Sequence, residues 1–253
     1  MTVLFLKELR SNWRSFRYPA FLLILLFFAI LDPLMLKYMN EIISYFATGM
    51  EIIMPDPTPE AAFLSYLSDV SQIGIMVLIF MAMGMVAREK ENGVTGWLLS
   101  KPIGRWQYLA AKLLALYSVI IIGLIACSAL AYLYTMSLLG QAALNGSILA
   151  TICLLVFTIY IATITFTFST LLKTPLLAGG PTLLLFFLSG IINMLITNSD
   201  AANFYPNTLL SLMKPLLEST ATAADLTWPM AVTTILILLM ILLAGYRFSK
   251  MEI

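Results

Sequence analysis

The chain has 253 residues, of which 61% are hydrophobic and 11% are charged, and its 14 basic residues nearly balance its 13 acidic ones. Soluble domains carry about 25% charged residues, so this composition excludes an ordinary soluble domain and predicts a polytopic α-helical membrane protein. The sequence contains no histidine, which excludes His-ligated zinc sites, Ser-His-Asp triads and Cys-His dyads.

The first 18 residues predict an amphipathic helix that lies flat in the membrane interface. At helical spacing, one face carries Phe5, Leu9, Trp13 and Phe16, and the other carries Lys7, Arg10, Arg14 and Arg17. Basic and aromatic residues on opposite faces are typical of interfacial helices. A signal peptide is the alternative, but the apolar run that follows is long and no small-x-small cleavage site ends it. The segment is therefore expected to be retained.

Six apolar runs are each expected to cross the membrane as a helix. They cover about residues 19–36, 72–87, 109–139, 148–171, 176–196 and 229–245. Thr58, Pro59 and Glu60 supply a cap, a first-turn proline and a first-turn acid, which predict a helix start before the second run. The sequence Gly179-Gly180-Pro181 is expected to weaken the fifth helix near its start.

The placement of lysine and arginine predicts the orientation. If both termini are cytoplasmic, only Lys37 and Lys214 of the 14 basic residues fall outside, as the positive-inside rule requires. No ionisable side chain falls in the middle of a span, where such groups usually relay protons or bind ions. This argues against a proton- or sodium-coupled carrier and against a charged ion channel. Energy for uphill transport would therefore come from outside the membrane.

The long charged stretch from Arg88 to Lys112 is the candidate for that energy input. A turn at Gly93 is followed by Trp97, Leu98 and Leu99, and these apolar side chains could insert into a groove of a partner. An ordinary solvated loop that obeys the positive-inside rule is the other interpretation. The chain itself carries no phosphate-binding loop, no G-x-G-x-x-G and no G-x-S-x-G motif. Its two cysteines lie in separate apolar runs, so no metal site is expected.

This stretch resembles the signature of type-2 ABC exporter permeases. The matching residues are Glu89-x-Glu91-x-Gly93, then Leu98-Leu99-Ser100-x-Pro102-Ile103-x-Arg105, then Tyr108 and Lys112. In that family the motif lies between the second and third of six spans, as it does here. The N-terminal helix is similar to the family's connecting helix, and the turn at residues 169–179 and the ending at 246–253 are similar too. One departure is Val94, where the family often has threonine; Thr95 follows one position later.

The resemblance implies an all-α architecture with six transmembrane helices and an N-terminal interfacial helix, as in type-2 ABC exporters. One permease domain would span residues 1–253, with the amphipathic helix at 1–18, a cytoplasmic coupling loop at 88–108 and an extracytoplasmic gate at 198–228. The residues expected to couple to the ATPase are Glu89, Glu91, Gly93, Trp97, Leu98, Pro102 and Arg105.

The resemblance also implies partners. Separate ABC ATPase subunits would bind ATP and Mg, which this chain would not hold itself, and a second copy or a paralogue would complete the permease. Membrane lipids are expected around the chain, in the cell membrane of a bacterium or archaeon, and no nucleic acid is expected to bind.

Three polar residues within the spans are candidates for a substrate pathway. Thr163 and Thr167 share a helical face with Thr170, but threonine also bonds back to its own helix carbonyls. Asn193 could line a pathway or bond to another helix. The leading hypothesis is an exporter subunit that moves an amphipathic or apolar substrate outward, such as a peptide, antibiotic or lipid. The alternative is a membrane scaffold that anchors a soluble partner through residues 88–108 and transports nothing.

Overall fold

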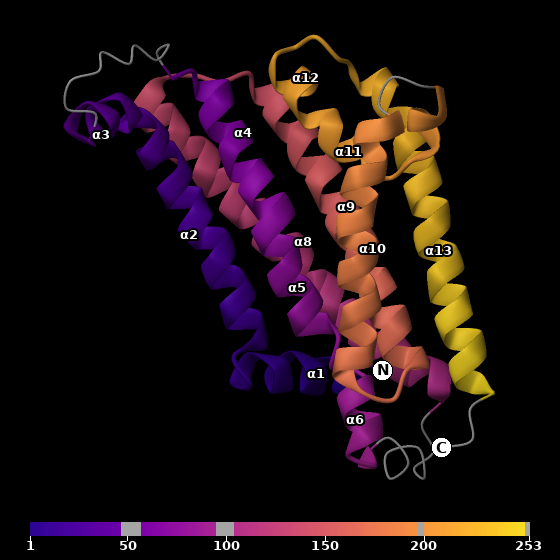
Figure 1. Ribbon diagram of the computed structural model, residues 1–253. Helices are drawn as coiled ribbons and strands as arrows, with labels where there is room; N and C mark the ends of the chain where they lie inside the picture. Colours follow the sequence, from indigo (N-terminus) through magenta and orange to yellow (C-terminus); the bar gives the residue numbers. More distant parts are fainter. Residues whose placement is uncertain (47–56, 95–103, 197–199, 251–253) are drawn as a thin grey trace.

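The computed structural model describes residues 1–46, 57–94, 104–196 and 200–250, which form an up-and-down helical bundle (Figure 1). Within these ranges no strand occurs, and six helical stretches are long and apolar enough to cross a bilayer. They are Arg17–Lys37, Pro59–Glu91, Arg105–Leu139, Leu144–Leu171, Pro175–Ile196 and Ala223–Ser249. The predicted all-α fold class with six spans is confirmed.

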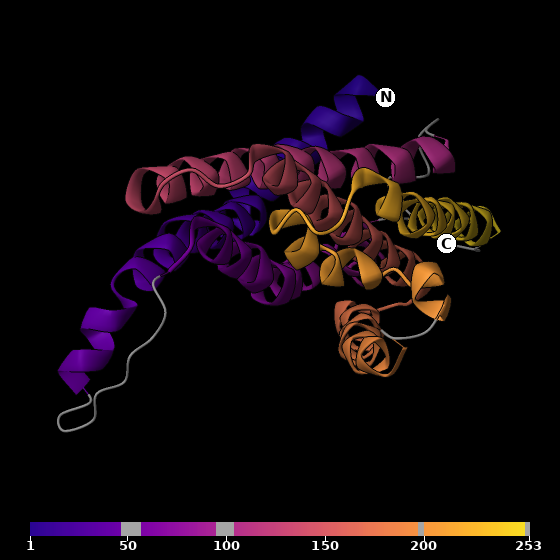
Figure 2. The same ribbon diagram turned by 90° about the horizontal axis from the view of Figure 1, so that it is seen from above.

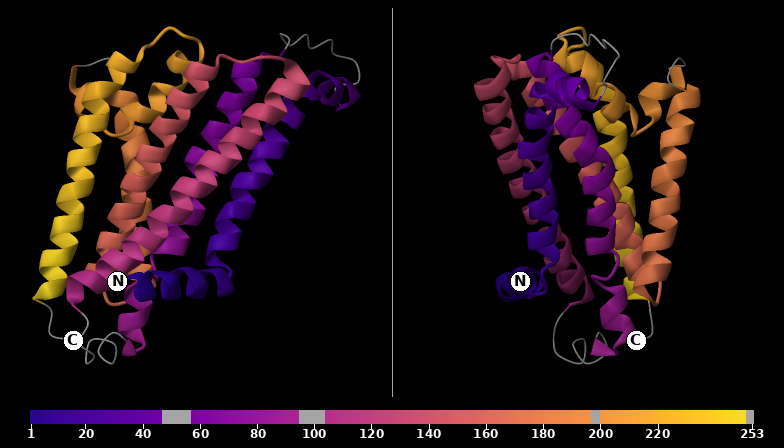
Figure 3. Two further views of the ribbon diagram at one scale, coloured as in Figure 1. Left: turned by 180° about the vertical axis from the view of Figure 1, so that it is seen from behind. Right: turned by 60° about the vertical axis from the view of Figure 1, so that its left-hand side comes forward.

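The N-terminus and the end of α13 (Thr227–Ser249) lie at one end of the bundle, the termini end, together with α1 (Thr2–Arg14) and α6 (Ala87–Glu91) (Figures 1 and 3). The opposite end, the far end, carries α3 (Met39–Phe46), α11 (Thr208–Ser211) and α12 (Met213–Leu217). The predicted topology requires the termini and the start of the 88–108 loop to share one side of the membrane, and the bundle places them together.

Helix α1 lies across the bundle, and α2 (Arg17–Lys37) runs along it (Figures 1 and 2). Helix α1 ends at Arg14 rather than at residue 18, because Phe16 takes a left-handed φ of 60° that turns the chain before α2. Trp13 and Phe16 are 55% and 74% exposed, whereas Glu8 and Asn12 are buried. Trp13 of α1 and Phe16 of the turn after it are therefore largely exposed, as expected for a helix seated in lipid.

The second span begins well before residue 72. Thr58 caps α4 (Pro59–Asp69) by accepting a hydrogen bond from the backbone N–H of Ala61 at 3.2 Å, which confirms the predicted helix start. A π-helical segment, η1 (Val70–Gly74), joins α4 to α5 (Ile75–Ala82). Because the outer part of this segment is already helical, the second span is longer than its most apolar stretch.

The bundle is centred on α9 (Leu144–Leu171), which packs against α8 (Arg105–Leu139), α10 (Pro175–Ile196), α13 (Thr227–Ser249) and α5. Helices α10 and α13 leave much of their apolar surface uncovered, including Leu184, Phe187 and Ile191 of α10. Helix α10 continues through Pro181 rather than ending there. These two helices therefore present broad apolar faces to lipid or to another membrane chain.

The segment predicted as an outer gate covers the far end of α9. It contains η2 (Asp200–Phe204), α11, α12 and η3 (Ala223–Leu226). The Tyr205 hydroxyl donates to the Ser189 carbonyl at 2.9 Å, and burial raises the pKa of this phenol, which keeps it a donor. The apolar stretch Thr208–Leu217 is too short to cross a bilayer.

Gly146 allows this segment to approach α9 closely. A Cβ at Gly146 would overlap the carbonyl oxygen of Leu216 in α12, a backbone atom that cannot rotate away, whereas a Cβ at Gly190 in α10 would meet no atom within 4 Å.

We expect Gly146→Ala to destabilise the protein by about 1–3 kcal/mol, the usual cost of overpacking. Gly190→Ala is the matched control, because both substitutions gain the same helix propensity. Thermal unfolding in detergent checks this; equal melting temperatures for the two variants would contradict the close contact.

Candidate functional site

Four side chains from three separate elements meet at the termini end. This junction cluster consists of Glu8 of α1, Glu89 of α6, and Tyr108 and Lys112 of α8. The Lys112 ammonium donates to Glu8 Oε2 at 2.9 Å and to Glu89 Oε1 at 2.8 Å. The Tyr108 hydroxyl donates to the other carboxylate oxygen of Glu89. The first residues of the predicted coupling loop are thereby bonded both to the interfacial helix and to the third span.

Burial makes these charge-assisted bonds important. Lys112 is 2% exposed and Glu8 is 5% exposed, so each would be costly to bury without a partner of opposite charge. Arg17, at the start of α2, also interacts electrostatically with Glu8 and Glu89. Lys7 Nζ also lies 3.6 Å from Glu8 Oε1. Lys112 is the cation bonded to both carboxylates, so removing it would leave the buried Glu8 and the half-buried Glu89 without their shared partner.

A second set of contacts ties α13 to the start of α8, next to the cluster. The Tyr108 ring stacks on Phe248, with ring centroids 5.7 Å apart. Arg105 Nη1 donates to the carbonyl oxygens of Phe248 at 3.2 Å and Ser249 at 2.7 Å, which are among the free acceptors at the end of α13. Gly245 has no Cβ and so leaves room for the Trp106 ring. The last turn of the sixth span is therefore fixed to the last residues of the predicted coupling loop.

Helix α6 is separate from α5 because the chain leaves helical geometry between Met83 and Val86. Ser169 of α9 satisfies the backbone groups that this break exposes. Its hydroxyl oxygen accepts from the N–H groups of Val86 at 3.1 Å and Ala87 at 3.0 Å, and it donates to the Met83 carbonyl at 2.8 Å. Such non-helical backbone within a membrane protein requires partners supplied by the protein. One serine thus stabilises the turn that carries α6 out of the bundle.

Lys90 attaches the other side of α6 to the same helix. Its ammonium donates to the carbonyl oxygen of Thr170 at 2.6 Å, in the last turn of α9. A cation at a helix C-terminus satisfies a free carbonyl and interacts favourably with the helix dipole. Helix α6 is consequently held by α9 through Lys90 and by α8 through Glu89, whose partner Lys112 also bonds to Glu8 of α1.

The residues predicted to couple to the ATPase divide into two groups among those the structure describes. Glu89 and Arg105 bond within the chain, to the junction cluster and to the end of α13 respectively. Glu91 and Gly93 are exposed, and Gly93 takes a left-handed φ of 69° that turns the chain just after α6. The remaining predicted coupling residues, Trp97, Leu98 and Pro102, lie outside the described residues.

The residues predicted to line a substrate pathway lie far from this cluster in the sequence. Thr163 is fully buried, donates to the Ile159 carbonyl at 2.6 Å and bonds to the Tyr117 hydroxyl of α8. Thr167 donates to the carbonyl oxygens of Thr163 and of Met240 in α13. Both threonines therefore bond to their own helix and to a neighbouring one, while Asn193 is half-buried in α10. A pathway function for these three residues stays a prediction.

Sequence reasoning did not single out Glu8 or Lys112 as site residues. Glu8 is the one acidic residue within the basic N-terminal helix, and Lys112 lies just inside a long apolar run. Each charge is unusual for its surroundings, and that was the sequence feature that could have marked these two residues as parts of a site. Their pairing could not be read from the sequence, because 103 intervening residues separate them and the path of the chain decides whether they meet.

A model of the family described as ABC-2 family transporter protein matches residues 2–253. The chain is also similar to the uncharacterized transmembrane protein YxlG of Bacillus subtilis (strain 168). The two are 24% identical over 256 residues, which cover 100% of this chain and 98% of the relative. The match to the family therefore extends over the interfacial helix, the junction cluster and all six spans.

We expect Lys112→Met to destabilise the protein by about 3 kcal/mol, the low end of the cost of breaking a buried ion pair, because Glu89 keeps some access to water. Adding Glu8→Gln and Glu89→Gln to the same chain should recover much of that loss, since the two carboxylates that Lys112 compensated are then neutral. Thermal unfolding of the purified proteins in detergent checks both. The control is Lys173→Met, an exposed cation at the same end of the bundle; a loss as large as that of Lys112→Met would contradict the analysis.

Proposed function

The chain belongs to the ABC-2 transporter family, and on that premise we propose that it is the membrane permease subunit of an exporter driven by a separate ATPase. As a multi-pass membrane subunit, it would not hydrolyse ATP itself. A partner ATPase would bind ATP and Mg, and a second permease, either a copy of this chain or a paralogue, would complete the transporter.

The junction cluster is the observation that supports coupling most directly. Helix α6 leaves the bundle through a break at residues 83–86 and leads into the 88–108 segment. Through Glu89, Lys112 bonds this helix to both α1 and α8. A force that an ATPase applies to the loop would therefore reach the interfacial helix and the third span together, rather than bending a solvated loop.

The exposed side of α6 is the part available to the ATPase. Glu91 and Gly93 are exposed, whereas Glu89 is engaged within the chain. We assign Glu89 to positioning the loop and Glu91 to contact with the partner. Trp97 and Leu98 would provide the apolar part of that contact, because aromatic residues commonly dominate the affinity of interfaces.

The composition of the spans supports the proposed substrate class, and the outward direction is proposed from membership of the family. The middle of each span lacks an Asp, Glu, Lys or Arg side chain, since Asp32 and Asp69 lie nearer the far end of their spans. This favours an amphipathic or apolar substrate such as a peptide, antibiotic or lipid. The broad apolar faces of α10 and α13 suit a second permease, between which such a substrate could pass. Transport would be outward across the cell membrane of a bacterium or archaeon, with both termini in the cytoplasm.

Cysteine labelling tests the orientation. We expect single cysteines at Asp56 and Glu218 to react with a membrane-impermeant reagent in intact cells, and cysteines at Lys101 and Lys250 to react only after permeabilisation. The native Cys127 and Cys153 are buried, so their replacement by alanine should be tolerated and leaves no background. Strong labelling at position 101 in sealed cells would contradict the proposed orientation.

Substitutions in the 88–108 segment test coupling to the ATPase. Trp97→Ala should weaken association with the cognate ATPase by about 30-fold, corresponding to the loss of about 2 kcal/mol at an aromatic hot spot. Glu89→Gln should leave association largely intact but uncouple hydrolysis from transport, because it weakens the bond between α6 and Lys112. Pull-down of the ATPase and substrate-stimulated hydrolysis in reconstituted vesicles measure the two effects.

Lys101→Ala is the control for these variants, as a change of charge outside the proposed contact. If Trp97→Ala binds and transports like the parent while Lys101→Ala fails, the contact has been assigned to the wrong residues. If the ATPase binds but no parent vesicle transports any substrate offered, the result favours the alternative in which the chain is a membrane scaffold.

A further inference from the structure

An apolar groove lies between α1 and the sides of α2 and α8 at the termini end. Its volume is about 770 Å³, within the range of roughly 300–1,000 Å³ typical of small-molecule sites. Trp13 of α1, Leu22 of α2 and Ile122 of α8 are among its lining residues. Trp13 and Ile122 are 55% and 68% exposed, so the described residues leave the groove open.

Arginine side chains occupy one edge of this groove. Apart from Arg10, Arg14 and Ser118, the residues that line it are apolar. The Ser118 hydroxyl is already used, because it donates to the Ala115 carbonyl at 2.9 Å. Arg10 and Arg14 therefore supply the polar groups that remain available to a molecule bound in the groove.

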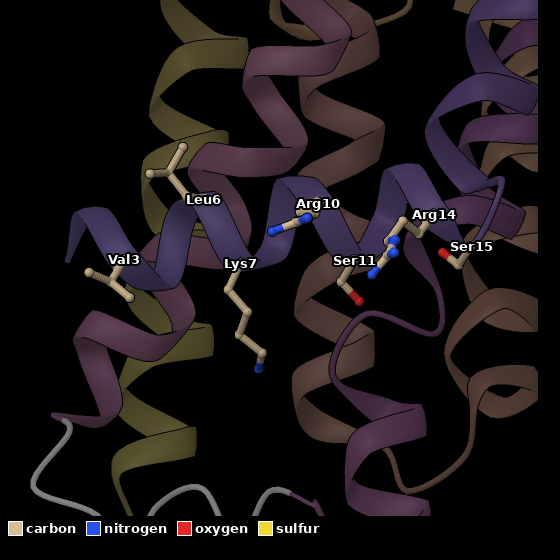
Figure 4. Close-up of a pocket in the computed structure, with 7 residues that line it drawn as sticks. All are labelled: Val3, Leu6, Lys7, Arg10, Ser11, Arg14 and Ser15. Atoms are coloured by element: carbon tan, nitrogen blue, oxygen red, sulfur yellow. The ribbon is translucent and has the colours of Figure 1, made fainter.

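The same two arginines also line a shallow cavity on the adjacent side of α1, which has a volume of about 680 Å³. Figure 4 shows Arg10 and Arg14 in a row along the helix, with Lys7 pointing down and Leu6 pointing up in this view. The two arginines thus stand at the boundary between an apolar groove and a basic surface, and a molecule that bridges this boundary would contact both.

Arg10 and Arg14 carry uncompensated charge. In the part of the chain that the structure describes, no carboxylate forms an ion pair with either of them. Glu8, the acidic residue of α1, faces inward and bonds to Lys112. Arginine presents several N–H donors in a fixed planar arrangement that matches the oxygens of a phosphate group. This edge of α1 therefore suits an anionic group carried on an apolar chain.

We propose that this groove is a binding site for one anionic phospholipid. An acyl chain lies in the apolar groove against Trp13, Leu22 and Ile122, and the phosphate is held by Arg10 and Arg14 at its edge. A lipid of net negative charge is preferred over a zwitterionic one, because Arg10, Arg14 and Lys7 would repel a headgroup ammonium. The bound lipid would connect α1 to α2 and α8 on the side opposite to the bond between Glu8 and Lys112.

Fluorescence quenching by brominated lipids tests this site in the purified chain, with no ATPase present. Trp13 lines the groove, and its signal is isolated by subtracting the spectrum of Trp13→Phe. In nanodiscs, brominated phosphatidylglycerol should quench this signal at concentrations about 30-fold lower than brominated phosphatidylcholine, given the usual effect of two basic residues near a membrane surface. Unbrominated phosphatidylglycerol should reverse the quenching, a measurement that needs no substitution at the arginines.

Arg10→Gln combined with Arg14→Gln should remove the preference between the two lipids, while Arg10→Lys with Arg14→Lys should keep most of it. The control for lost charge is Lys173→Gln combined with Arg247→Gln, two exposed cations at the termini end that do not line the groove. Equal quenching by both lipids in the parent, or a preference unaffected by the arginine-to-glutamine pair, would overturn the proposal. Trp13 that neither lipid quenches would overturn it too, and would indicate that another protein chain covers the groove.

Discussion

The ammonium of Lys112 lies within hydrogen-bond distance of two carboxylates that belong to different elements, Glu8 of α1 and Glu89 of α6. Both elements are short, and an isolated helix of this length is marginal in water. The third span, by contrast, is long and anchored in the bundle. One buried cation therefore fixes two peripheral helices to a rigid one, and the direction of α1 and the start of the coupling loop become parts of a single arrangement.

Reaching Lys112 requires α6 to leave the axis of α5, and the backbone break at residues 83–86 makes this possible. A break in a membrane helix exposes N–H and C=O groups that lipid cannot satisfy. Ser169 of α9 bonds three of them, and Lys90 reaches the last turn of the same helix. The central helix thus supports the turn, and the ion pairs then decide where α6 points. Movement of α6 would disturb both sets of bonds, which makes them a physical route between the proposed ATPase contact and the bundle.

The remaining surfaces divide the chain into sides with different partners. Helices α10 and α13 expose apolar side chains along most of their length, which suits contact with a second membrane chain. At the termini end, the groove beneath α1 combines apolar walls with two unneutralised arginines, which suits lipid rather than a matching protein surface. Helix α1 consequently has three distinct faces: an acidic and amide face toward the protein, an aromatic face toward the groove and an exposed basic face.

The sequence by itself determined the class of fold, the six spans and the interfacial helix, because these depend on local properties. Apolar length decides whether a helix can cross a bilayer, and the spacing of Trp13, Arg10 and Arg14 decides that α1 is amphipathic. The helix cap at Thr58 and the family signature around Glu89 could also be recognised from residues that are close together in the sequence. The predicted ends of the helices were less accurate. Helix α1 ends before Phe16, whose left-handed φ no sequence pattern indicated. The second span starts in a helix that is only partly apolar.

Only the tertiary structure decided what the polar residues do. Glu89 could have faced a partner, but its carboxylate turns inward to Lys112 and Tyr108, and Glu91 takes the exposed position. Glu8 looked like an ordinary charge in a basic helix until the turn at Phe16 carried α1 back beneath α8. Glu8 and Lys112 are 104 positions apart, and Glu89 is 23 positions from Lys112. Both pairings depend on how helices pack rather than on which residues favour a helix. A local sequence pattern predicts where helices form, whereas the packing of helices that are distant in the sequence determines which charged side chains form ion pairs.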